Sequence, residues 1–300
     1  MRTAFLAFMI LLSCSQFAGA KGCIEKAREV APALSDTVRI QYNEKLAEAK
    51  AAFDARPRDA EAIVWLGRRT AYPGRYKDSI RIFTDGIALF PNDARMYRHR
   101  GHRYLTLRCF DEAVADFEKA AILVKGKSDE IEPDGLPNAK NIPTSTLQSN
   151  IWYHLGLAYY LKGDFKSALR AYREAETVST NNDMRVATAY WHYMTLRRLG
   201  KTKEAKRVLE PYSGNIELIE NNDYLQLIKL NRGETTADTM LAGIQGPADI
   251  LGSASIGYGI GNYFFYNGDR EKARTIFRKI VEGNQWSSFG YIAAEAELKR

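Results

Sequence analysis

Like residues recur in this chain at a spacing of 34 positions, and this repetition limits its fold more than any other feature. Gly67 is followed after twelve positions by a small residue, Ser79, and after sixteen by an aromatic residue, Phe83. The same pattern starts again at Gly101, Gly156 and Gly261. Self-similarity with a period of roughly 20 to 50 residues is typical of stacked supersecondary units, each of which packs mainly against its neighbours.

The residue types in this pattern predict a pair of antiparallel helices in each unit. A small residue such as Gly67 on the first helix lets the second helix approach closely. Gly74, seven positions later, would end the first helix in a left-handed turn, a conformation that costs other residues more. Ser79 and Phe83 are four positions apart and therefore share one face of the second helix. Pro91 then prevents that helix from continuing.

Further positions around each small residue complete the pattern. In two repeats an aromatic residue stands four positions before it, and in three a tyrosine or phenylalanine stands three positions after it. A leucine stands just before it in two repeats, whereas Arg100 takes that position before Gly101. These positions are filled by Tyr97 and Trp152, by Leu66 and Leu155, and by Tyr104, Tyr159 and Phe264. In these residues the chain resembles the tetratricopeptide-repeat family. The resemblance implies an all-α fold, a right-handed superhelix of antiparallel helix pairs known as an α-solenoid.

The spacing also predicts how the chain is divided. We expect an N-terminal segment over 21–34 and the solenoid over 35–300, with a leading helix over 35–56 and a capping helix over 287–300. Clear repeats are expected near 60–93, 94–127, 149–182 and 254–287, and weaker ones near 186–219 and 220–253. Gly101 and Gly156 are 55 residues apart, 21 more than one repeat, and the surplus marks an insertion over 125–146. A polar loop of this length is usually functional or disordered, and a lengthened second helix is the remaining alternative.

The first twenty residues have a different character from the rest. Arg2 precedes a nine-residue apolar run from Ala4 to Leu12, and small residues end at Ala20. This order is typical of a secretory signal peptide over residues 1–20, and the run is too short for a membrane-spanning helix. Leu11-Leu12-Ser13-Cys14 also resembles a bacterial lipobox, so lipidation of Cys14 competes with cleavage after Ala20. Both predict an exported protein, periplasmic or associated with the outer membrane of a bacterium.

Charge and cysteine content narrow the classes of partner. The formal net charge is +7, and it falls to +6 when Arg2 leaves with residues 1–20. This mild excess over a large surface is not the footprint of a nucleic-acid-binding protein. No later apolar run approaches the ~20 residues of a membrane helix. Cys23 and Cys109 remain in the mature chain, where they form either a disulfide or two unrelated thiols.

Sequence signatures of catalysis and of cofactor or metal binding are missing. The close glycines from Gly257 to Gly261 fall on an expected helix with no strand before them, so they do not form a phosphate loop. The chain has no Gly-x-Ser-x-Gly elbow and no Cys-x-x-Cys pair. His99 and His102 could share a helix face, but the sequence positions no further metal ligand beside them. We therefore predict a protein that is not an enzyme and that uses neither cofactor nor metal.

The resemblance implies that the first helix of each pair lines a concave groove that binds a partner. Arginine pairs carboxylates through its planar fork, and tyrosine gives contact area at a small cost in entropy. We predict a scaffold in the cell envelope whose groove binds an extended peptide or protein segment, one with acidic groups. The expected groove residues are Arg68, Tyr72, Arg95, Arg98, His102, Tyr153, Tyr160, Tyr190, Arg197, Tyr258, Asn262 and Tyr266.

Two other functions stay open at the level of sequence. One is an accessory subunit of an envelope enzyme or assembly complex, with the 125–145 loop as a lid. The other is a structural envelope protein that self-associates. The alternative to a binding groove is that the tyrosines only pack between helices and that the arginines are only solvated surface residues. The Lys-and-Asn clamp with which some relatives hold a terminal carboxylate does not occur at these positions.

Overall fold

The computed structural model describes residues 22–133, 135, 138, 140–243 and 254–300, so the expected signal peptide and Cys14 lie outside it. Within these ranges all regular elements are helices, which confirms the expected all-α fold. The first part of the chain contains α2 (Asp36–Ala55), α3 (Ala60–Ala71), α4 (Tyr76–Leu89), α5 (Ala94–Thr106) and α6 (Phe110–Val124). The second part contains α7 (Leu147–Lys162), α8 (Phe165–Val178), α9 (Asn182–Arg198), α10 (Thr202–Leu209), η1 (Glu210–Tyr212), α11 (Asn222–Arg232), α12 (Ala237–Gly243), α13 (Ala254–Tyr266), α14 (Arg270–Val281) and α15 (Phe289–Lys299).

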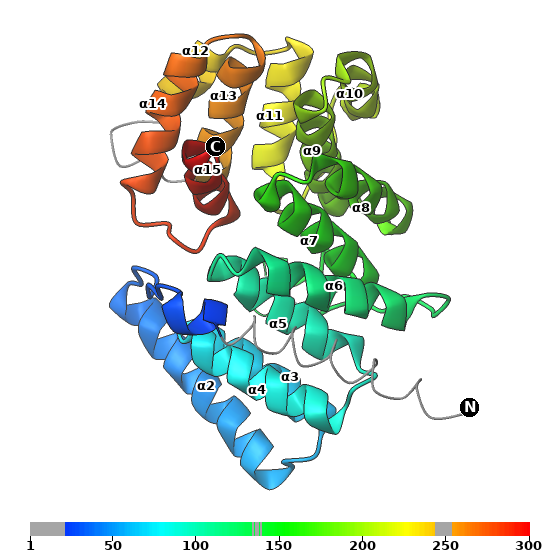
Figure 1. Ribbon diagram of the computed structural model, residues 1–300, viewed down its shortest axis with the longest axis vertical. Coiled ribbons are helices and arrows are strands. Elements are labelled where there is room, and N and C mark those ends of the chain that lie inside the picture. The colour runs from blue at the N-terminus through cyan, green and yellow to red at the C-terminus, as the bar shows by residue number, and fades with distance from the viewer. Residues whose placement is uncertain (1–21, 134, 136–137, 139, 244–253) are drawn as a thin grey trace, which may run out of the picture.

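Successive helices stack as antiparallel pairs. α3 packs on α4, α5 on α6, α7 on α8, α9 on α10 and α13 on α14. The first helices also contact one another, α3 with α5, α5 with α7 and α7 with α9, so that they follow one another along one side of the stack. Figure 1 shows α2–α6 as one part of the array and α7–α15 as the other. The expected α-solenoid is confirmed.

The small residue of each repeat lies directly against the aromatic residue sixteen positions later. A Cβ at Gly67 would lie 2.4 Å from Phe83 Cζ, and a Cβ at Gly261 would lie 2.4 Å from a ring carbon of Phe277. Real Cβ atoms do not approach other heavy atoms so closely, so glycine permits this helix spacing. Phe83 and Phe277 are buried as a result, as the pattern predicts.

The first helices end in left-handed residues at the expected positions. Gly74, Gly163 and Gly268 have φ values of +97°, +84° and +95°. In the repeat that begins at Gly101 the equivalent residue is Arg108, which has a φ of +64° although it carries a side chain. A left-handed conformation costs an L-residue roughly 1–2 kcal/mol. The contacts of the Arg108 side chain therefore have to offset that cost.

The weakest repeats are supported by a buried acid. Asp183 near the start of α9 accepts hydrogen bonds from the backbone N–H groups of Ile219, Glu220 and Asn221 at 2.9–3.2 Å. These bonds fix the irregular connection that leads into α11. The range 220–253, where the repeat pattern is poor, begins with α11 and α12, and residues 244–253 lie outside the described ranges.

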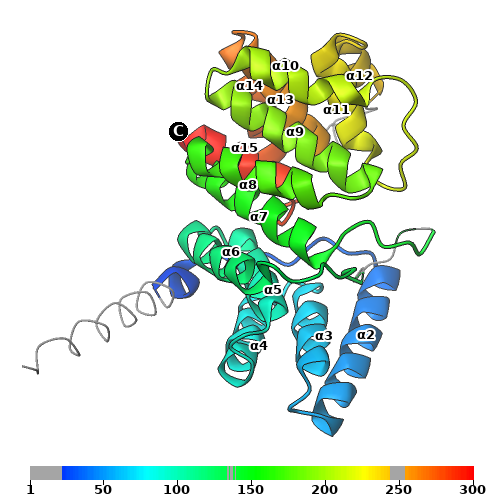
Figure 2. The ribbon, with the colours of Figure 1, turned by 90° about the vertical axis from the view of Figure 1, so that its right-hand side faces the viewer.

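The C-terminal helix does more than cap the array. α15 packs on α13 and α14, as expected for a capping helix, and it also contacts α7 in the middle of the chain. Figures 1 and 2 both show α15 beside α7 within the second part of the array. A Cβ at Gly290 would lie 2.2 Å from the carbonyl oxygen of Ala254, so glycine permits the close approach of α15 to α13. The array therefore turns back on itself.

Candidate functional site

Most tyrosines of the predicted groove are buried inside the protein. Tyr160, Tyr190 and Tyr258 are at most 1% exposed, and Asn262 and Tyr153 are buried as well. The prediction that these residues line an open surface is wrong for this part of the chain. The physical reason is that other segments of the same chain cover them.

α15 is one segment that covers them. Glu297 on α15 has a buried carboxylate whose oxygens lie 2.7 Å from Arg198 Nη1 and 3.2 Å from the Tyr258 hydroxyl. The Tyr258 hydroxyl is also 3.0 Å from that of Tyr160, and Arg300 donates to the Tyr160 carbonyl at 2.9 Å. Burial and the Glu297 carboxylate raise the pKa of Tyr160 to about 12, so its hydroxyl stays protonated. The chain's own C-terminal helix thus occupies the aromatic part of the groove.

Further predicted groove residues join α9 to α13. Arg197 donates to the carbonyl oxygen of Tyr266 at 2.8 Å and to the Tyr193 hydroxyl at 2.7 Å. The Tyr266 hydroxyl donates to the Met194 carbonyl at 3.2 Å, and the Asn262 amide lies 3.5 Å from the Met194 sulfur. These side chains hold two helices together and do not face an open surface.

His102 lies where the two parts of the array meet. Its ring centroid is 4.8 Å from that of His154 on α7 and 5.3 Å from that of Phe289 at the start of α15. Arg98 Nη1 lies 3.2 Å from His102 Nδ1, and because a guanidinium only donates, the ring proton belongs on Nε2. Burial, followed by the charge of Arg103, lowers the pKa of His102 well below its usual value, so the ring is neutral at pH 7.

The insertion covers the first part of the groove. Arg98 and Glu132 form a buried ion pair in which Nε and a carboxylate oxygen are 2.9 Å apart. Arg68 donates to the carbonyl oxygen of Pro133 and Arg69 to that of Gly135, both at 2.7 Å. Glu132, Pro133 and Gly135 therefore lie against α3 and α5, held through one carboxylate and two backbone carbonyls.

Backbone hydrogen bonds fix the base of the insertion. The Glu132 N–H donates to the Ser145 carbonyl at 3.1 Å, and the Leu147 N–H donates to the Glu130 carbonyl at 2.9 Å. α6 ends at Val124, so the alternative of a lengthened second helix is wrong. The described residues of the insertion form a loop that returns directly to α7.

The two remaining predicted groove residues interact within the first part of the array. Arg95 forms ion pairs with Asp93 at 2.6 Å and with Glu61 at 2.7 Å. The Tyr72 ring packs against Tyr42 of α2 with centroids 5.7 Å apart. Both residues therefore have neighbours from their own chain, although each is only partly buried.

Open space remains beside the insertion. A cavity of 180 Å³ between α3, α5 and the insertion is lined by residues that include Val64, Arg68, Arg95 and Ile131. A wider one of 690 Å³ lies between the α4–α5 turn and the base of the insertion. Ile131 is 68% exposed, which is unusual for a large apolar side chain. The inner surface is therefore most accessible at the first two repeats.

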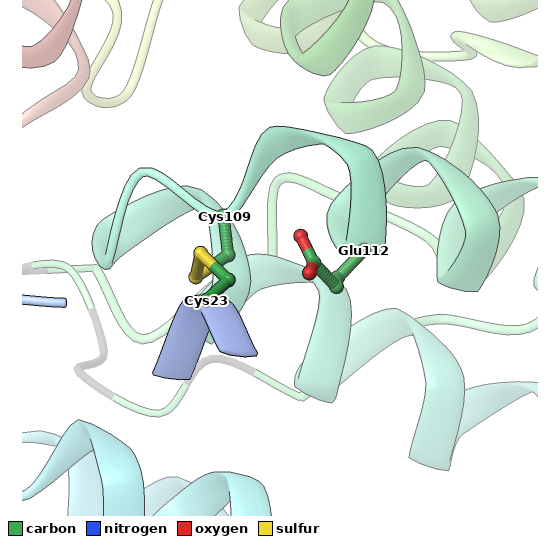
Figure 3. Close-up of side chains that lie close together, drawn as sticks. All are labelled: Cys23, Cys109 and Glu112. Carbon is green, nitrogen blue, oxygen red and sulfur yellow. A yellow bond between two sulfur atoms is a disulfide. The ribbon is translucent and has the colours of Figure 1, made fainter. Parts of the chain in front are cut away.

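Cys23 and Cys109 are joined by a disulfide, with Cα atoms 5.9 Å apart (Figure 3). It ties the N-terminal segment to the residue that precedes α6. Glu112 in the first turn of α6 lies close by. Among the described residues, Cys23, Cys109 and Glu112 form the one group of three potential metal ligands whose ligand atoms lie close together. Because both sulfurs belong to the disulfide, neither is the thiolate that a metal requires.

Several residues that define this site are missing from the sequence prediction. Glu132 belongs to a run of acidic residues in the insertion, and the arginines predicted for the groove were a signal that such a residue could pair with them. Glu297 stands in a charged stretch of a terminal helix, which is typical of a solvated face. Arg108 fills a position at which other repeats have glycine, and that departure is visible in the sequence.

Comparison with known proteins identifies one repeat by its sequence and finds solved structures that resemble the chain. Residues 149–182, which contain α7 and α8, match the family model for the tetratricopeptide repeat. A search of curated proteins gave no match. No helix in the described ranges is both long and apolar enough to cross a membrane.

Several solved structures are similar at low identity. YrrB, described as a TPR protein with an unusual peptide-binding site, is 16% identical over 84% of this chain and 98% of its own, with a TM-score of 0.43. A crystal structure of MamA is 15% identical over 78% of this chain and 98% of its own, with a TM-score of 0.40. The nearly identical TPR-like repeats of a Podosopora anserina putative kinesin light chain are 12% identical over 82% of this chain and 99% of their own, with a TM-score of 0.43.

Because these TM-scores lie below 0.5, the similarity to tetratricopeptide repeats rests on other observations. One is the matched repeat at 149–182. The other is the set of four helix pairs in which an aromatic ring packs on a glycine sixteen residues earlier, at Gly67, Gly101, Gly156 and Gly261. Repeats of this family generally act as non-catalytic scaffolds for protein interaction. Residues 149–182 are thus similar to a tetratricopeptide repeat, and the described chain has the α-solenoid fold of stacked helix pairs.

Proposed function

We propose that this protein is an exported, non-catalytic scaffold that binds an extended acidic segment of another protein on the inner face of α3 and α5. The observation that carries the proposal is how the insertion lies on these helices. Arg98 holds the Glu132 carboxylate, while Arg68 and Arg69 hold backbone carbonyls. Every peptide offers carbonyls, and an acidic one also offers a carboxylate, so a partner segment presents the same groups.

Exchange of the insertion for such a segment replaces each contact with a similar one. A buried arginine that loses its partner is costly, but in this exchange Arg98 passes from one carboxylate to another. Arg68 and Arg69 likewise pass from one carbonyl to another. The exposed Ile131 and the neighbouring cavities of 180 and 690 Å³ provide additional surface for the partner. The energetic cost of displacement is therefore small.

A direct test uses the insertion itself as the ligand. In the variant, residues 129–143 are replaced by a short Gly-Ser linker, and a labelled peptide with the sequence of residues 128–145 is added in solution. We expect saturable binding by fluorescence anisotropy. Arg98→Gln in the same background should weaken it about tenfold or more, because the carboxylate of the peptide would then be buried without a positively charged partner. Arg58→Gln, at an exposed position outside the groove, is the matched control.

The outcome is decisive in both directions. A variant with unchanged helical circular dichroism that does not bind the peptide contradicts the proposed groove. Binding that Arg98→Gln leaves intact also contradicts it. If binding follows Arg98, crosslinking in the native envelope followed by mass spectrometry identifies the partner protein.

Export is the second part of the proposal. The signal-like residues 1–20 support it, and so does the Cys23–Cys109 disulfide, because disulfides persist in oxidising compartments. Cell fractionation with mass spectrometry of the N-terminal peptide tests it. We expect an envelope protein that begins after Ala20 or at a lipid-modified Cys14. A cytoplasmic protein that retains Arg2 contradicts export.

A further inference from the structure

A second, smaller cavity of 100 Å³ lies beneath the insertion, between α3, α4 and α5. It is distinct from the cavity beside the surface on which a partner segment is proposed to bind, although Arg68, His99 and Glu132 line both. Positive side chains dominate its wall. The lining residues are Arg68, Tyr72, Phe83, Arg98, His99, His102, Arg103 and Glu132.

The charges that line this cavity do not balance. Three guanidinium groups, those of Arg68, Arg98 and Arg103, face a single carboxylate, that of Glu132. Glu132 pairs with Arg98, whereas among the described residues Arg68 contacts the Pro133 carbonyl oxygen and the Trp65 ring but no carboxylate. Among the residues that the structure describes, the lining side chains therefore leave two positive charges without an anion.

Arg103 is the most exceptional of these groups. Within the part of the chain that the structure describes, the Arg103 guanidinium forms no hydrogen bond and no ion pair, and its carbon lies 6.0 Å from the centre of the Tyr76 ring. Burial, together with the charges of Arg98 and Arg68, lowers the pKa of Arg103 to about 10. A partly buried guanidinium at pH 7 is still charged, and beside two further guanidinium groups it favours an anion as its neighbour.

The two histidines add hydrogen-bond donors without adding charge. Burial, followed by the charge of Arg98, lowers the pKa of His99 well below its usual value, and His102 behaves alike. Arg98 Nη1 lies 3.4 Å from His99 Nδ1 and 3.2 Å from His102 Nδ1, so each ring keeps its proton on Nε2. The cavity wall is thus rich in donors.

We propose that this cavity binds one doubly charged tetrahedral oxyanion, of the phosphate or sulfate class. Such an ion neutralises the two unbalanced charges of Arg68 and Arg103. Guanidinium forks match the oxygen geometry of these ions. A cavity of 100 Å³ has room for a few water molecules or one small ion. The site goes beyond the proposed scaffold function because it needs no partner protein.

The test measures binding of inorganic phosphate and sulfate to the full mature chain by isothermal titration calorimetry at pH 7.5. Acetate and chloride at equal ionic strength are the comparison ions. We expect one saturable site for phosphate and for sulfate, with much weaker binding of acetate. Arg103→Gln should weaken phosphate binding at least about tenfold. Arg58→Gln, an exposed arginine, should leave it unchanged.

A second measurement uses the unsubstituted protein and so does not depend on how a variant folds. The chain has four histidines, whose ring signals can be followed by NMR. Phosphate should shift the signals of His99 and His102, which line the cavity. His192, which pairs with Glu176 on α8, should not move and serves as the internal control.

Phosphoserine as a further ligand distinguishes the two sources of the anion. If only the inorganic ions bind, the site holds a free ion. If phosphoserine binds equally well, the site accepts a group carried on a larger molecule. The proposal is overturned if no oxyanion binds, if chloride reproduces the effect, or if Arg103→Gln binds phosphate as well as the unsubstituted protein. The peptide test of the groove contains no phosphate, so the two proposals can fail separately.

Discussion

Arg108 and Glu295 are 187 residues apart in the sequence, yet Arg108 Nε lies 2.9 Å from a carboxylate oxygen of Glu295. The guanidinium also lies 3.9 Å from the centre of the Trp286 ring and donates to the Trp286 carbonyl at 2.9 Å. Arg108 makes these contacts from a left-handed backbone conformation. One residue of the second clear repeat thus connects the first part of the array to the segment that contains α15.

The backbone and the side chain of Arg108 should have separable effects on stability. Arg108→Ala keeps the unfavourable left-handed conformation and loses the contacts, so we expect the free energy of unfolding to fall by about 2 kcal/mol. Arg108→Gly loses the same contacts but adopts positive φ freely, and should be about 1 kcal/mol more stable than the alanine variant. Urea unfolding measures both, and a glycine variant no more stable than the alanine variant contradicts the role of backbone strain.

Removal of the Glu297 carboxylate should be strongly destabilising. Glu297→Ala leaves Arg198 charged and largely buried, and such a loss costs about 3–5 kcal/mol. The double variant Arg198→Met with Glu297→Leu should recover much of that loss, because it leaves no buried charge unpaired, and Arg300, the other partner of Glu297, lies at the exposed end of the chain. Lys299→Ala, two residues further along α15 and exposed, is the control. Equal unfolding midpoints in urea for Glu297→Ala and Lys299→Ala would be inconsistent with a buried ion pair.

The disulfide should stabilise the protein by restricting the unfolded chain. Cys23 and Cys109 are 86 residues apart in the sequence. Loss of a disulfide typically lowers the free energy of unfolding by about 2–4 kcal/mol. Cys23→Ser with Cys109→Ser should therefore lower the urea midpoint. Reduction with dithiothreitol should produce the same shift in the unsubstituted protein and none in the double variant. A midpoint that reduction does not move would show that the bond adds no stability.

Stability should fall as the pH drops below about 6.5, the usual histidine pKa and the value expected in the unfolded chain. Burial lowers the pKa values of His99, His102 and His154 in the folded protein. Below pH 6.5 the unfolded chain therefore binds protons that the folded chain does not, and each histidine removes up to ~1.4 kcal/mol per pH unit. Urea unfolding between pH 7.5 and 5 measures the slope. His154→Gln should lower the slope of the unfolding free energy against pH by the amount that corresponds to about one proton. A slope that this substitution leaves unchanged contradicts the prediction.

The helix pairs could be predicted because their causes are local. The distance from Gly67 to Phe83 fixes how two adjacent helices pack, and a left-handed turn at Gly74 follows from sequence neighbours alone. The groove could not be predicted in the same way, since its occupants come from elsewhere in the chain. Nothing near Tyr160 in the sequence indicates that Glu297 will approach it, and local patterning describes Glu297 only as a polar helix residue.

The return of α15 to α7 changes how an array of this kind can unfold. In an open repeat protein each unit contacts only its neighbours, so the end units can fray while the middle stays folded. Here the last helix contacts the middle of the array, and the Arg108–Glu295 pair spans most of the remaining chain. Loss of either end exposes surfaces in the centre, so unfolding becomes cooperative over many repeats. The same long-range contacts slow folding, because a closed array has to bring distant segments together before it gains their stability.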